Sequence, residues 1–283
     1  MNLSSNESKQ HVTIVQPPGK WHYFDFSEFQ SHYELLYFLA WRDIKVRYKQ
    51  ALLGVGWALV QPVMLMIVFT FIFGKMAQLN SDGVPYPIFT FVAILPWTLF
   101  SSSLSSAGVS LVANSALLKK VYIPRLLIPV AAIIPNLVDF LIGMVVLGVM
   151  MVYYHNSIQL SWNLLLLPFL VLFTMISALS AGLWLSALNV KYRDVKQLTP
   201  FLVRTWMWIS PVAYSAVEVP SGPWRIVYGL NPMVGVIQGF RWILIGGEPP
   251  TVLIFLSLSV VVLLLITGLI YFRKTEVYFA DIV

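Results

Sequence analysis

Long uncharged apolar runs alternate along this chain with clusters of basic residues, and no other feature constrains its fold as strongly. All but three of the 18 Lys and Arg residues lie in four stretches that flank the apolar runs: 9–49, 119–125, 191–204 and 273–274. A bilayer distributes charge in this way because cytoplasmic loops accumulate Lys and Arg. The pattern predicts an all-α, multi-pass membrane protein whose N- and C-termini both face the cytoplasm.

Six segments are apolar enough to cross the hydrocarbon core, which requires about 20 residues of helix. We predict spans at about 57–74, 85–111, 126–153, 162–188, 200–217 and 251–272. An even number of spans agrees with two termini on the same side. The chain would then divide into a cytoplasmic N-terminal segment (1–56), a transmembrane domain (57–272) and a cytoplasmic tail (273–283).

Residues 31–50 have the pattern of an amphipathic helix. Aromatic and apolar residues recur at spacings of four and three and form one stripe: Tyr33, Tyr37, Trp41, Ile44 and Tyr48. Such a helix lies along the cytoplasmic membrane surface, but a helix packed on the protein's own spans needs the same pattern. Both alternatives remain open. The candidate interfacial residues are Trp41, Arg42, Lys45, Arg47 and Lys49.

Residues 218–250 are apolar but interrupted by many Pro and Gly residues, so a single helix cannot persist there. We predict two short helices, at about 224–230 and 233–245, which form a re-entrant hairpin on the outer side of the membrane. Irregular backbone at membrane depth is tolerated only against protein or a watery cavity. A transport pathway is therefore expected nearby.

The sequence lacks the motifs of an enzyme. There is no phosphate-binding GxxxxGK[ST] loop, the four His residues lack metal-ligand spacing, and Cys is absent. We expect no catalytic, cofactor or metal site in this chain, so the energy for any work must come from elsewhere. The net charge is +6. The basic residues responsible lie in loops beside apolar spans, which favours binding to lipid headgroups and acidic partners over nucleic acid.

Three segments resemble, in the family's order, the permeases of polysaccharide-exporting ABC transporters of the type-2 family. The first segment resembles the opening of the family and consists of Tyr33-Glu34-Leu35-Leu36, Trp41 to Lys49, Leu53-Gly54, Trp57 and Gln61-Pro62. The second resembles the family's fourth loop and fifth span and consists of Tyr192 to Val195, Pro200 and Ser210 to Tyr214. The third resembles the outer gate and consists of Asn231-Pro232-Met233 and Gly239-Phe240-Arg241. The resemblance covers about residues 33–272, and residues 1–30 match no part of it.

The resemblance implies a homodimeric permease in the bacterial inner membrane, paired with two copies of an ATPase subunit that holds ATP and magnesium. Its cargo would be a lipid-linked polysaccharide, with O-antigen as the first expectation and capsular polysaccharide or teichoic acid as alternatives. Two other classes stay open: a membrane enzyme acting on polyprenyl-linked sugars, and a passive channel.

Two inner loops are expected to contact the ATPase. The candidate residues are Leu117, Lys119, Lys120, Tyr122, Arg125, Tyr192, Arg193 and Asp194. Loops that only set the orientation of the chain would carry the same charges. The candidate outer-gate residues are Tyr228, Asn231, Pro232, Gly235, Gly239 and Arg241.

Aromatic rings can hold the apolar faces of sugars, so we expect some of them to line the conduit. The candidates are Trp184, Trp206, Trp208 and Tyr214, although interfacial anchoring explains such rings as well. Trp206 and Trp208 point to different helix faces, so at most one is expected to line a conduit. Asp139 is the only acidic residue well inside a predicted span, and such a carboxylate usually faces a cavity or a partner.

Overall fold

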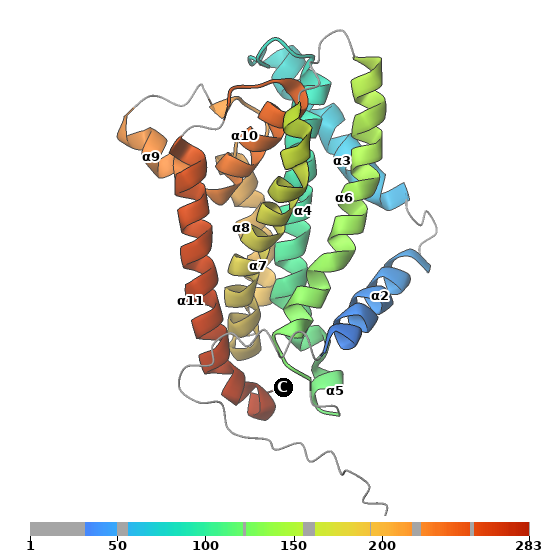
Figure 1. The fold of residues 1–283 in the computed structure, drawn as a ribbon, viewed down its shortest axis with the longest axis vertical. Coiled ribbons are helices and arrows are strands. Elements are labelled where there is room, and N and C mark those ends of the chain that lie inside the picture. The colour runs from blue at the N-terminus through green and yellow to red at the C-terminus, as the bar shows by residue number, and fades with distance from the viewer. Residues whose placement is uncertain are drawn as a thin grey trace, which may run out of the picture.

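In the computed structural model of this chain, the described residues are 32–49, 56–120, 123–154, 162–192, 194–216, 222–249 and 252–282. Throughout these ranges the regular elements are helices (Figure 1). The predicted N-terminal segment up to residue 31, and the candidates Tyr122 and Arg193, lie outside the described residues.

Five helical segments in the described part of the chain are long and apolar enough to cross a membrane. They are α3 (Gly56–Phe69) with its π-helical continuation η1 (Thr70–Met76), α4 (Tyr86–Ala113), α6 (Leu127–Tyr153), the short η3 (Trp162–Leu166) continued by α7 (Leu167–Lys191), and α11 (Val252–Ile282). Each coincides with a predicted span to within a few residues, apart from the longer C-terminal end of α11. Length and hydropathy were therefore sufficient to predict these five helical segments.

The predicted span 200–217 differs from the structure. Here α8 (Val195–Ile209) begins five residues before Pro200 and is only 15 residues long. The helix ends because Pro211 disfavours a helical conformation in the preceding residue, and Ser210 is accordingly extended, with a ψ of 149°. Residues 210–216 then form turns instead of continuing the helix. A sixth span thus stays a prediction.

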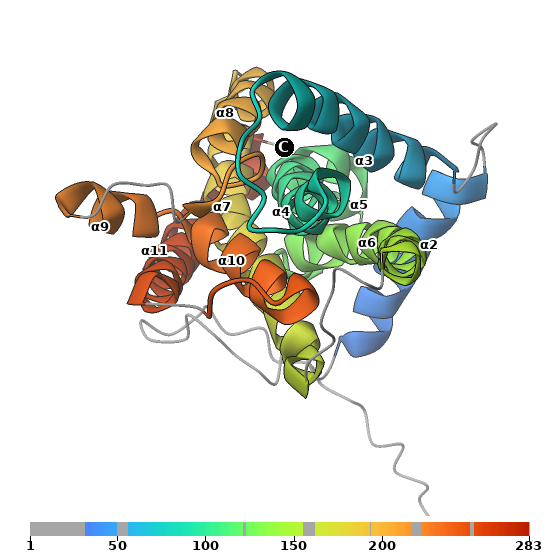
Figure 2. The same cartoon turned by 90° about the horizontal axis from the view of Figure 1, so that it is seen from above.

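The helix α4 is the centre of the bundle. It packs against α3, α6, α7, α8 and α10, which surround it when the bundle is seen from above (Figure 2). A helix that is apolar on every face is stable only when it is enclosed by other helices or lipid. Phe89, Phe91 and Phe100 of α4 are fully buried, so this helix supplies most of the large side chains of the core.

The N-terminal helix α2 (Tyr33–Lys49) lies obliquely against α6 (Figure 1). Its buried residues are Leu39 and Ala40. The rings of Tyr33, Tyr37 and Trp41 remain exposed. The helix therefore packs on the protein through one face and leaves the first half of its aromatic stripe uncovered. Contact of these rings with the membrane surface stays a prediction.

Two short helices occupy the segment predicted as the hairpin, α9 (Pro223–Gly229) and α10 (Pro232–Ile245). Pro232 is the first residue of α10, where its missing N–H costs no hydrogen bond. The helix ends at Gly246, whose φ of 70° is left-handed and favours glycine. Both helices lie at the opposite end of the bundle from the single-turn helix α5 (Ser115–Leu118) and the C-terminal end of α11 (Figure 1). Membrane depth and sidedness of the hairpin stay predictions.

Candidate functional site

Asp139 ties the N-terminal helix to the bundle. Its Oδ2 lies 2.5 Å from Nη1 of Arg47, and its Oδ1 accepts a hydrogen bond from the hydroxyl of Tyr48. Arg47 Nη1 also donates to Oδ1 of Asn136, at 2.9 Å. Asp139 lies about 18 Å along α6 from Leu127, at 1.5 Å per residue. The sequence singled out this carboxylate but did not identify its partners, which are two residues of α2.

The Tyr48 hydroxyl is a hydrogen-bond donor at neutral pH. Burial, followed by the hydrogen bond to Asp139, raises the pKa of Tyr48 above its ordinary value. The phenol therefore stays protonated and keeps its hydrogen bond to the carboxylate.

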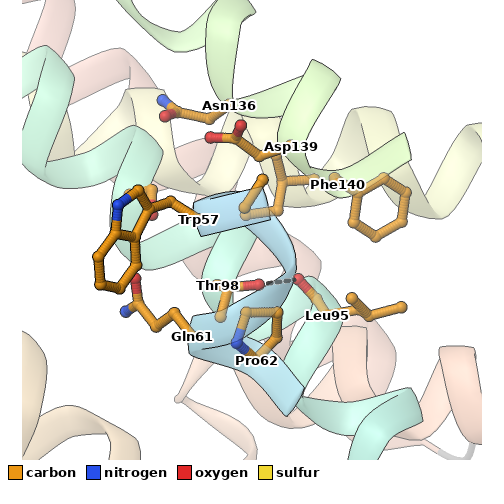
Figure 3. Close-up of a pocket in the computed structure, with 11 residues that line it drawn as sticks. Trp57, Gln61, Pro62, Leu95, Thr98, Asn136, Asp139 and Phe140 are labelled. Carbon is orange, nitrogen blue, oxygen red and sulfur yellow. Dashed lines mark hydrogen bonds between the residues drawn. The ribbon is translucent and has the colours of Figure 1, made fainter. Parts of the chain in front are cut away.

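A small pocket with both polar and apolar walls lies beside Asp139, between α3, α4 and α6. Figure 3 shows Asn136 and Asp139 projecting from α6 toward the side where Trp57 and Gln61 of α3 lie. Its water-accessible space is about 50 Å³, which is room for a few water molecules. A sugar ring does not fit in this pocket, which we call the Asp139 pocket.

A larger, almost entirely apolar groove of about 690 Å³ runs between α4, α7, α8 and α11. Trp184 and Trp206 both line it. The Trp184 ring stacks on Tyr271 of α11 with a centroid distance of 4.6 Å, and Trp206 Nε1 donates to Oδ1 of Asn231 at 2.9 Å. We call this surface the Trp184–Trp206 groove.

The other conduit candidates lie elsewhere. Trp208 points to another face of α8, where its ring lies 6.0 Å from Phe69 and 6.3 Å from Phe73. The Tyr214 hydroxyl accepts a hydrogen bond from Tyr228, at 3.1 Å. Asp139 belongs to its own pocket. The structure thus brings two of the five candidates together, Trp184 and Trp206.

Arg241 of α10 holds the turn segment that follows α8. Its side chain is buried, and it donates to the carbonyls of Tyr214 at 2.9 Å and Val212 at 3.1 Å. Its guanidinium carbon lies 3.7 Å from the centroid of the Phe89 ring. A buried guanidinium needs several acceptors, and the irregular backbone of residues 210–216 provides them because its carbonyls are not used within a helix.

Asn231 joins the same two segments from the other side. Its Oδ1 accepts from the backbone N–H of Met233 as well as from Trp206, and its Nδ2 donates to Oγ of Ser210 at 3.0 Å. Asn231 is therefore both the N-cap of α10 and a link to α8. Two motifs that are about 20 residues apart, around 210–214 and 231–241, form one hydrogen-bonded unit.

The two glycines of the candidate outer gate are packing positions. A Cβ on Gly235 would lie 2.9 Å from Cβ of Ser257, and a Cβ on Gly239 would lie 2.8 Å from Cδ1 of Leu170. These glycines allow α10 to lie directly against α11 and α7. The structure thereby accounts for their small size by close packing.

The candidate ATPase-contact residues lie at one end of the bundle. Lys119 and Lys120 are exposed after α5, and Tyr192 and Asp194 are exposed between α7 and α8. Asp194 occupies the N-cap position of α8, but its carboxylate makes no capping hydrogen bond. Arg125 is different, because its guanidinium donates to the carbonyl of Glu276 and so ties this region to α11.

Sequence reasoning missed two asparagines. Asn136 is 1% exposed and joins Arg47 to α4 through Oγ of Ser106, at 3.3 Å. Asn114, at the end of α4, accepts a hydrogen bond from Arg42 at 2.8 Å. The sequence did indicate both residues, because a polar amide inside or at the end of an apolar helix requires a hydrogen-bond partner.

Comparison with known proteins identifies the family. The sequence profile of the ABC-2 type transporter family matches residues 34–245. The O-antigen export system permease protein RfbA of Klebsiella pneumoniae is 26% identical over 251 residues, 88% of this chain and 95% of that protein. RfbA of Myxococcus xanthus is 28% identical over 215 residues, covering 76% and 81% of the two chains.

A relative named for a different cargo is the polysialic acid transport protein KpsM of Escherichia coli. It is 24% identical over 249 residues, which are 83% of this chain and 91% of KpsM. Family membership and the apolar helices together make the protein a multi-pass inner-membrane protein. From the match over most of its length, the chain belongs to the ABC-2 type transporter family.

Proposed function

We propose that this chain is the permease subunit of an ATP-driven exporter that moves lipid-linked polysaccharide, with O-antigen as the first cargo to test. One observation carries the proposal: relatives covered almost from end to end are named for O-antigen export or polysialic acid transport. Family membership makes the chain a transporter subunit. Capsular polysaccharide and teichoic acid remain the alternative cargoes.

The energy would come from two copies of a separate ATPase subunit that binds ATP and magnesium. The sequence contains no phosphate-binding loop. One end of the bundle exposes Lys119, Lys120 and Asp194, whereas Arg125 is engaged by the carbonyl of Glu276 in α11. The three exposed side chains are suited to an ATPase surface that carries both acidic and basic groups.

The conduit would lie between two copies of the chain. A polysaccharide is too long to be enclosed, so it must be threaded, and the Asp139 pocket has room for only a few waters. A two-fold dimer can build a continuous passage at its symmetric interface. The Trp184–Trp206 groove is the candidate wall, because its aromatic rings can hold sugar faces without sequence preference.

A membrane enzyme acting on polyprenyl-linked sugars is the rival function. Such an enzyme needs an acid or base that is available to its substrate. Both oxygens of Asp139 are instead engaged, by Arg47 and Tyr48. This contact favours a transporter over an enzyme that uses Asp139.

Deletion of the gene tests the proposed function. We expect the deletion strain to lose surface O-antigen and to accumulate lipid-linked polymer inside the cell, and we expect the wild-type gene to restore export. Immunolabelling of intact cells measures the first quantity, and extraction of the lipid-linked pool measures the second. Normal surface polysaccharide of every kind would contradict the proposal, whereas loss of capsule or teichoic acid alone would select an alternative cargo.

A further inference from the structure

Polar contacts tie α2 to the bundle at two places, and these connect different parts of the molecule. Near the middle of α2, Arg42 Nη2 donates to Oδ1 of Asn114 at 2.8 Å. At its C-terminal turn, Arg47 and Tyr48 bind Asp139 of α6. Arg42 and Arg47 are separated by about 7.5 Å along the helix axis, at 1.5 Å per residue. Because an α-helix is stiff over this length, the two anchors must move together.

The first anchor sits at a junction. Asn114 is the C-cap of α4 and also precedes α5, and its Nδ2 donates to the carbonyl of Ser110 at 2.9 Å. The exposed Lys119 and Lys120 follow directly after α5. Under the proposed function this loop contacts the ATPase, so any displacement of α5 by the partner acts on Asn114 and hence on Arg42.

The second anchor sits at the Asp139 pocket. Arg47 and Asp139 have side chains that are 35% and 30% exposed, and the contact continues through Asn136 to Ser106 of α4. Trp57 and Gln61 of α3 line the same pocket. A movement of α2 therefore changes the contacts between α6 and α3, the helix whose η1 end lies against Trp208 of α8.

We propose that Asp139 is a positioning residue of the transport cycle. By binding Arg47 and Tyr48 it fixes α2 so that a shift of the α4–α5 junction, received at Arg42, is transmitted to the pocket between α3 and α6. The inference rests on the proposed function, since it requires a partner that moves α5. Asp139 itself touches no cargo in this scheme and acts through α2.

A purely structural contact would have another consequence. Removing one member of a partly buried ion pair leaves the other charge without its partner, whereas replacing both members by apolar residues of similar size removes that penalty. If the pair only stabilises the fold, the double variant R47M/D139L should recover both abundance and export. If the pair positions α2, the double variant should recover abundance but not export.

The experiment compares D139N, R47M and R47M/D139L in cells, with E34Q as a matched acid-to-amide control on the exposed side of α2. We expect surface polysaccharide per permease molecule to fall about tenfold in all three variants, a size typical of couplings between sites. E34Q should export normally. Wild-type export per molecule by R47M/D139L would overturn the proposal.

Hydrogen exchange of the purified permease provides a readout that does not depend on the cargo. We expect amides of 33–49 to exchange at least several-fold faster in D139N than in the wild type or E34Q, with α4 unchanged. Unchanged exchange of α2 in D139N would overturn the proposal even if export fell. If deletion of the gene leaves polysaccharide export unchanged, the proposed function fails, while the exchange result still shows whether Asp139 fixes α2.

Discussion

Single polar residues hold the irregular parts of this bundle. Within the turn segment 210–216, the carbonyls of Val212 and Tyr214 accept hydrogen bonds from Arg241, while Asn231 links the segment to α10. Burial of a guanidinium is costly unless hydrogen bonds compensate for its lost hydration. The two bonds to the turn segment and the contact with the Phe89 ring account for a cation in α10, which is otherwise uncharged.

Replacement of Arg241 by Ala should destabilise the protein strongly. The change removes two charge-assisted hydrogen bonds and leaves the carbonyls of Val212 and Tyr214 without these donors, which should cost about 3 kcal/mol. Intrinsic Trp fluorescence during thermal unfolding of the purified protein measures the loss as a lower Tm. Arg225→Ala, on α9, is the control and should leave Tm nearly unchanged. Equal Tm values for the two variants would show that Arg241 does not hold the turn segment.

At the scale of elements, α10 is defined by how closely it approaches its neighbours. Gly235 faces α11 and Gly239 faces α7, each without space for a Cβ unless the neighbouring side chain shifts. Nearly every residue of α10 is buried. Small residues permit this close contact between apolar helices, where packing is the main attraction.

Gly239→Leu should therefore reduce the amount of folded permease in the membrane several-fold, because the added side chain must displace Leu170 or separate α10 from α7. Gly148→Leu is the matched control, since a Cβ at Gly148 of α6 meets nothing within 4 Å. Membrane abundance and surface polysaccharide should be measured together. Normal abundance of Gly239→Leu with impaired export would instead indicate that this contact is a movable seam of the gate.

For the whole molecule, the charge pattern and the helix directions agree with one orientation. The exposed Lys119 and Lys120 directly follow α5, which lies at the end of the bundle opposite to α9 and α10 (Figure 1). Basic loops are retained in the cytoplasm. The hairpin end is accordingly predicted to face outward.

The Cys-free chain allows this orientation to be tested directly. Lys119→Cys should react with a membrane-impermeant maleimide only in inverted vesicles, and Glu248→Cys should react in intact spheroplasts. Both residues are exposed, so neither needs the fold to open. Labelling of both positions from the same side would refute the predicted topology.

The sequence by itself determined most of the helical segments and the family to which the chain belongs. Hydropathy located the five span-length helices, because burial in lipid is a property of each segment alone. Pro and Gly positions located α9 and α10, because these residues act on the local backbone. Local turn chemistry was a weaker guide. The predicted span 200–217 places Pro211 in the interior of a helix, whereas in the structure Pro211 follows the end of α8. The family motifs were likewise readable without coordinates.

Only the tertiary structure decided which side chains meet. Asp139 was recognisable as an unusual carboxylate, but its partner Arg47 is 92 residues away and lies on a helix whose tilt no local pattern specifies. The same holds for the aromatic candidates, of which Trp184 and Trp206 share a groove while Trp208 turns to another face. Helix periodicity sets the direction of a side chain relative to its own axis. The crossing and rotation of packed helices set what that side chain touches, and these depend on the whole bundle at once.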